Sequence, residues 1–213
     1  MKLFTCLLLG GSFNWKEPLA GVAGPTTTST LSSSKAAEQK NEKIMELLEI
    51  AKTVGQVGSL ASEEDQTKME AAAAEVIPFS DSKSPAKYPL TGIHNLVYSA
   101  APGASSGKIG PLVGKVSQFF EDEGDIFYNR VAFGPLQIAL RAKREIKNAS
   151  IIKVSFLETS FNLFGKTVKK GQAGGGGVWK VKFVGTYQDE NGNEKLLRIM
   201  ETPSLFVLES DLN

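Results

Sequence analysis

Hydrophobic and polar residues alternate along much of the second half of the chain. In VWKVKFVGTY, residues 178–187, one side of an extended strand would carry Trp179, Val181, Phe183, Gly185 and Tyr187. The segments 125–133, 136–143 and 151–158 repeat this alternation. In the second of them Ile138, Leu140 and Ala142 share a side. This period of two predicts β-strands with one buried face.

Turn signals separate these segments. Asn191-Gly192 is the typical pair of a tight hairpin turn, and Gly134-Pro135 is another turn. Successive one-faced strands with short turns predict an antiparallel meander of eight or nine strands, closed into a barrel or folded as a sandwich. A barrel of about eight strands has room for one small ligand. The glycine-rich stretch 171–177 is expected to be a flexible loop rather than a strand.

Before residue 80 the apolar residues recur every three or four positions instead of every two, and two helices are expected there. Apolar residues recur at helical spacing between residues 44 and 54, and Gly55 ends that pattern. Ser62 is placed to cap a second helix, which Pro78 stops. An amphipathic pair of this kind can lie on a membrane. Neither helix has a basic polar face, so packing on the following domain is favoured.

The N-terminal residues 1–34 are typical of a targeting segment. MKLFTCLLLGGSF has the size of a signal-peptide core, with Phe13 near the expected cleavage point, and the stretch that follows is rich in hydroxyl residues and poor in acids. A signal-like segment followed by a transit-like segment is the order expected of a bipartite plastid-targeting sequence. The alternative is a disordered N-terminus with a chance apolar run. We therefore divide the chain into residues 1–34, a helical lead over 35–89 and a β domain over 90–213.

Composition and motifs narrow the function. With 24 basic and 23 acidic side chains there is no basic surplus for nucleic acid, and no apolar run approaches the ~20 residues that span a bilayer, so we expect a soluble or surface-attached protein. Cys6 and His94 are the only cysteine and histidine, which excludes an internal disulfide and a Cys/His zinc site. The stretch 105–120 has Gly-Lys pairs, but Ile109 and Val116 break the phosphate-loop pattern. With no triad, metal cluster or cofactor loop, we expect no catalysis, no metal and no cofactor.

Three segments together resemble a known family. They are LTGIHNLVYS (90–99), GPLVGKVSQ (110–118) and TYQDENGNEKLLRIMETPSLFVLE (186–209). In their order and spacing they are similar to the plastid lipid-associated proteins, the fibrillin family. The sequence departs from the family pattern at His94, where tryptophan is usual, and at Glu201-Thr202, where Arg-Gly is frequent.

The resemblance implies a lipocalin-like antiparallel β-barrel that binds lipids or isoprenoid quinones at plastoglobule and thylakoid membranes. We therefore expect a non-catalytic protein that binds or shields fatty acids, quinones or pigments at such plastid surfaces, in a chloroplast or a secondary plastid. The rival interpretation is a coat or docking module for a lipid- or quinone-synthesis enzyme, with a closed and packed barrel. The segment 105–115 is expected at the barrel rim, as a portal, a contact with lipid or only a long connection.

The candidate ligand-binding residues are apolar or aromatic strand residues plus one arginine: Tyr98, Ile138, Leu140, Phe156, Trp179, Phe183, Tyr187 and Arg198. The aromatic residues would line a cavity for an acyl or prenyl chain, or else form a closed core. Arg198 would pair with a lipid headgroup if it faces inward. Outward placement in plain alternation is the other possibility, since Leu197 and Ile199 fit the inward face. His94 has no partner that would make it a catalytic base, and we expect a locally satisfied strand histidine.

Overall fold

The computed structural model describes residues 28–121, 124–202 and 204–212. Two α-helices, α1 (Thr28–Val54) and α2 (Glu63–Val76), precede the sheet, with short 3-10 turns at Gly58–Leu60, Ile77–Phe79, Pro85–Lys87 and Gly103–Ser106. The expected mainly β fold with two leading helices is confirmed. Residues 1–27, most of the expected targeting segment, lie outside the described residues, and α1 begins within its last part.

Nine strands form one antiparallel sheet in the order β6-β5-β4-β1-β11-β10-β9-β7-β8, and β6 also pairs with β7. Eight strands thereby close into a ring, from which only β8 is left out. A separate small hairpin, β2–β3, lies between β1 and β4. The strand bounds are β1 Gly92–Ser99, β2 Lys108–Ile109, β3 Leu112–Val113, β4 Lys115–Phe120, β5 Ile126–Phe133, β6 Leu136–Ile146, β7 Ile151–Leu163, β8 Lys166–Gln172, β9 Gly176–Gln188, β10 Glu194–Glu201 and β11 Leu205–Asp211.

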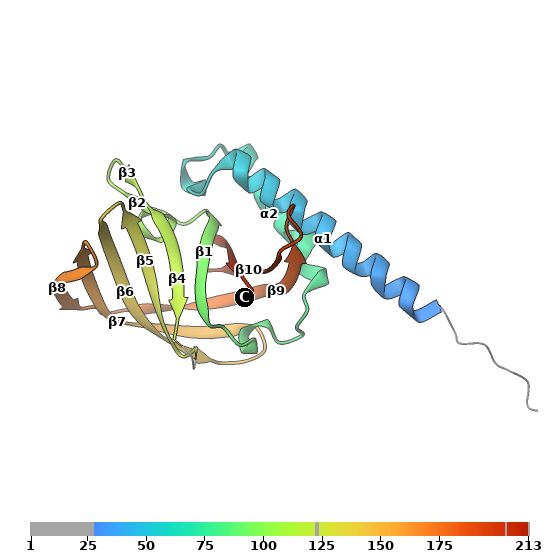
Figure 1. The fold of residues 1–213 in the computed structure, drawn as a ribbon. Helices are drawn as coiled ribbons and strands as arrows, with labels where there is room; N and C mark the ends of the chain where they lie inside the picture. Colours follow the sequence, from blue (N-terminus) through green and yellow to red (C-terminus); the bar gives the residue numbers. More distant parts are fainter. Residues whose placement is uncertain (1–27, 122–123, 203, 213) are drawn as a thin grey trace, which may run out of the picture.

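The long strand β7 has two partners on one edge. Its first half, Ile151–Ser155, pairs with the start of β9 and closes the ring. Its second half, from Glu158, pairs with β8, so that the β7–β8 hairpin extends beyond the ring (Figure 1). The expectation of a loop over residues 171–177 is therefore wrong in part. β8 runs to Gln172 and β9 starts at Gly176, because backbone pairing with β7 holds glycines in strands despite their freedom.

The helices cover the outer face of one side of the ring, beside β1, β9 and β10 (Figure 1). Ile44 and Leu47 of α1 and Met69 of α2 are fully buried against strand residues there. The expected cap is confirmed, since the Ser62 side chain accepts a hydrogen bond from the backbone N–H of Asp65. Among the described residues, no helix is both long and apolar enough to cross a bilayer.

Two of the four register shifts in the sheet, those in β1 and β9, decide which face several candidate residues present. β1 pairs Leu96 with Leu208 but Tyr98 with Val207, so Val97 is an extra residue. β9 pairs Phe183 with Ile199 but Val181 with Met200, which leaves Lys182 as the extra residue. A bulge of this kind moves every following side chain to the opposite face.

Candidate ligand cavity

The ring encloses a cavity of about 420 Å³. This size lies within the roughly 300–1,000 Å³ typical of small-ligand sites. Every strand of the ring contributes a mainly apolar side chain to the lining: Leu96, Val116, Val131, Leu140, Phe156, Trp179, Met200 and Leu208. The interior of the ring is therefore incompletely filled by its own side chains.

The cavity lies toward the end of the ring where β1 and β10 end and β9 begins. Ser105, Thr202 and the Gly176-Gly177 pair line it there. Ala104 and Ser105, which line the cavity there, are exposed, so this end is open to solvent. We call it the open end of the ring.

Four of the eight candidate residues line this cavity. Ile138 and Leu140 project inward from β6, Phe156 from β7 and Trp179 from β9. The Trp179 ring meets Phe127 edge-on, with ring centroids 5.7 Å apart. Phe127 in turn stacks on Phe120 at 5.2 Å. Trp179 thus belongs both to the cavity wall and to an aromatic row beneath it.

Three other candidates do not line the cavity. Tyr98, Phe183 and Tyr187 lie in the cluster under α1 and α2, on the outer face. The expectation that Trp179, Phe183 and Tyr187 share one face is wrong, because the bulge at Lys182 reverses the alternation. The bulge at Val97 turns Tyr98 outward in the same way. The Tyr187 hydroxyl donates to Glu209 Oε2 at 2.8 Å, and burial, followed by this contact, raises the pKa of Tyr187.

Arg198 faces the ring interior and is only 2% exposed. The strand neighbours expected to face inward, Leu197 and Ile199, lie under the helices instead. One guanidinium nitrogen of Arg198 donates to Gln118 Oε1, and the guanidinium lies over the Phe120 ring, 5.0 Å from its centroid. Gln118 itself lines the cavity, so a single side chain separates Arg198 from the cavity space.

Two further buried polar residues contact the aromatic ring of Phe120. Arg144 of β6 lies 5.8 Å from the Phe120 centroid, and the His94 imidazole meets Phe120 edge-on at 5.2 Å. We call Gln118, His94, Arg144 and Arg198 the polar cluster. All four are at most 6% exposed.

Burial dominates the electrostatics of the polar cluster. It lowers the pKa of Arg198 to about 9, with a further contribution from the charge of Arg144. Burial, and then the charge of Arg198, lower the pKa of His94 to about 3, an effect partly offset by the Thr91 backbone. At neutral pH the guanidinium is therefore charged and the imidazole is neutral.

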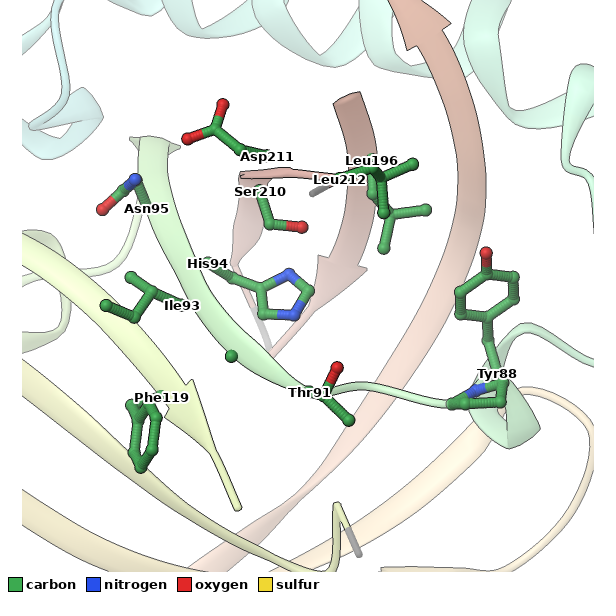
Figure 2. Close-up of a pocket in the computed structure, with 12 residues that line it drawn as sticks. Tyr88, Thr91, Ile93, His94, Asn95, Phe119, Leu196, Ser210, Asp211 and Leu212 are labelled. Carbon is green, nitrogen blue, oxygen red and sulfur yellow. The ribbon is translucent and has the colours of Figure 1, made fainter. Parts of the chain in front are cut away.

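His94 also lines a second, more open pocket of about 940 Å³ at the opposite end of the ring. Figure 2 shows its imidazole among Thr91, Ser210 and Leu196, with Tyr88 at the pocket's side. The polar cluster thus lies between the cavity, which Gln118 lines, and this pocket, which His94 lines. His94 is indeed a strand histidine, but neither of its ring nitrogens has a hydrogen-bond partner of good geometry among the described residues.

Sequence reasoning missed Gln118, Arg144 and Met200 as interior residues. Gln118 shares the inward face of β4 with Phe120, and Arg144 shares that of β6 with Ala142. The alternation in the sequence was the signal that could have identified both. Among the residues that the structure describes, no group of His, Cys, Asp and Glu is arranged to hold a metal ion.

The segment 105–115 does lie at the open end, as the connection between β1 and β4 that contains the β2–β3 hairpin. Leu112 and Val113 of this hairpin are 55% and 54% exposed. The Gln56 side chain donates to the carbonyls of Ser106 and Gly114, at 2.8 and 3.0 Å, and so ties the segment to the end of α1.

The chain matches no protein-family model, no curated protein and no solved structure.

Proposed function

We propose that the protein binds one lipophilic molecule inside the ring, which would act as a lipocalin-like barrel and shield its ligand from water. The observation that carries the proposal is the apolar cavity to which all eight ring strands contribute. Removing apolar ligand surface from water contributes ~25 cal/mol per Å². Fatty acids, isoprenoid quinones and pigments are the ligand classes that fit such a lining.

The exposed hairpins at the open end support attachment to a lipid surface. Phe164, in the turn of the β7–β8 hairpin, is 77% exposed, and Val168 of β8 is 63% exposed. Phe164 and Gly165 both have positive φ, 48° and 75°, as a two-residue type I′ turn requires. This conformation is unfavourable for a bulky side chain, so folding alone gives no reason for phenylalanine there.

Lysines accompany these apolar side chains. Lys166 and Lys169 of β8 and Lys115 of β4 are exposed, and none of the three forms a salt bridge with a described residue. A surface of exposed apolar and basic side chains suits an anionic membrane or droplet. Together with the resemblance to the plastid lipid-associated proteins, it supports peripheral attachment at thylakoid or plastoglobule surfaces.

Native mass spectrometry of the full chain after exposure to a plastid lipid extract tests the proposal. A retained fatty acid, quinone or pigment is expected. Ile138→Trp should abolish retention, because the indole would fill the cavity that Ile138 lines. The matched control is Gln137→Trp, at the neighbouring position on the outer face, which should retain the ligand.

A protein without ligand under all conditions would contradict the proposal. The protein would then act through its surface, as the coat or docking module considered above. Equal loss of ligand in both tryptophan variants would show that the cavity is not the site.

A further inference from the structure

Arg198 carries a buried positive charge for which the described structure offers no counter-ion. It lies within the ring, 2% exposed, and makes no salt bridge with any described residue. Its one hydrogen bond to a side chain goes to the neutral Gln118. The charge that acts on it is that of Arg144, a second buried guanidinium. A buried charge without a partner is unfavourable unless something else compensates it.

Among the described residues, no acid fills this role for Arg198. Asp125 acts on Arg144 rather than on Arg198, and it is exposed. Glu201 of the same strand pairs with Lys182 at 2.9 Å. His94 is neutral and cannot supply negative charge. Because arginine is effectively always protonated, proton loss does not relieve the charge either.

The cavity has one polar wall, and it adjoins this charge. Gln118 on β4 and Asn129 on β5 are direct cross-strand partners, and both line the cavity. Arg198 is paired in register with Leu208, another lining residue, and Met200 beside it lines the cavity as well. The two amides and the guanidinium behind them therefore mark the inner end of a mainly apolar space, whose other polar side chains, Ser105 and Thr202, lie at the open end.

We infer that the ligand is a single-chain amphiphile with an anionic headgroup, bound head inward. The headgroup would contact the Gln118 and Asn129 amides and take the place of Gln118 as the partner of Arg198. The chain would extend past Ile138, Leu140 and Trp179 toward the open end. Guanidinium forks suit carboxylate and phosphate oxygens alike, so anionic charge is the shared chemistry. This inference rests on the proposed function, since it names the ligand class of the same cavity.

The test compares three probes of equal chain length on the full protein: dodecanoate, dodecyl phosphate and dodecanol. Binding is followed through Trp179 fluorescence in a Trp15→Phe background. The two anionic probes should bind at least about 10-fold more tightly than the alcohol, as expected of a charge-assisted hydrogen bond in a buried site. Inorganic phosphate alone should neither bind nor compete.

Arg198→Gln should remove this preference by weakening the anionic probes about 10- to 100-fold, with dodecanol unchanged. Arg141→Gln is the matched control, because Arg141 lies on the outer face of the ring, and it should keep the preference. Arg198→Met should leave the thermal midpoint of the ligand-free protein unchanged or raise it, since an uncompensated buried charge is removed. A purely structural arginine would lower it.

Equal affinity for dodecanol and dodecanoate in the unaltered protein would overturn the inference while leaving lipid binding intact, and it needs no variant that must fold. Binding of inorganic phosphate would also overturn it, since the site would then take a free anion through the pocket that His94 lines. Failure of all three probes and of the plastid extract would instead remove the proposed function itself.

Discussion

The two faces of the same sheet differ in how completely they are packed. On the outer face, Tyr98, Phe183, Leu197 and Ile199 are fully buried against α1 and α2. Packing there is close enough that a Cβ on Gly58 would lie 2.3 Å from the Tyr98 ring. On the inner face, side chains of the same strands surround about 420 Å³ of empty space.

The difference indicates where stability and function reside. Closely packed side chains gain dispersion contacts on all sides, whereas side chains around a cavity lose them on one side. The helix-covered face therefore contributes stability, and the inner face leaves space that a ligand would fill. Four substitutions test this division, in order of decreasing effect on stability.

Phe183→Ala should destabilise the protein most, by about 3–5 kcal/mol, because it opens a hole in the face that the helices cover. Phe183 is fully buried in that cluster. Urea denaturation followed by circular dichroism measures the change. A loss below about 1 kcal/mol would mean that the helices are only loosely attached, and the contrast between the faces would fail.

His94→Leu should reduce the loss of unfolding free energy between pH 7 and pH 4 by about 3 kcal/mol. The folded pKa of about 3 is below the unfolded value of about 6.5, so protonation favours the unfolded chain. Stability from this residue is complete above pH 6.5 and falls as the pH drops toward 3. The charge that acts on it is that of Arg198, which stays positive throughout this range.

Urea titrations of both proteins at several pH values isolate the His94 contribution, because the carboxylates common to both cancel. The free energy of unfolding of His94→Leu, minus that of the unaltered protein, should rise by about 3 kcal/mol from pH 7 to pH 4. Parallel curves would mean that His94 is hydrated in the folded protein and that the inner face is wetter than its burial indicates.

Ile138→Ala should cost about 1 kcal/mol or less, below the range of about 2–5 kcal/mol for closely packed sites. Ile138 lines the cavity and already lacks contacts on that side. The same urea titration applies, with Phe183→Ala as the reference. A loss as large as that of Phe183→Ala would show that the inner face is packed shut in solution.

Phe164→Asn should change stability least, with a gain of up to about 1 kcal/mol, because Asn-Gly suits a type I′ turn better than Phe-Gly. It should nevertheless weaken binding to vesicles that contain anionic lipid, measured by co-sedimentation. Ile146→Asn, at an apolar position that is 39% exposed at the opposite end of the ring, is the control for lost apolar area. Unchanged vesicle binding after Phe164→Asn would exclude the hairpin from the lipid contact.

Local pattern sufficed for much of the fold. The alternation around Ile138 and Leu140 placed both on the inner face, and the Ser62 cap and the helical spacing before it identified the helices. These features depend on neighbours within a few residues, which a sequence displays directly.

The faces of Tyr98, Phe183 and Arg198 were decided only in the tertiary structure. Single extra residues at Val97 and Lys182 reverse the alternation, and nothing in the local composition marks them, because a bulge depends on how a strand pairs with its neighbours. Leu197 and Ile199 lie on the outer face. They are nevertheless apolar, because α1 and α2 cover that face. A strand with two buried faces has no polar side from which its orientation can be read.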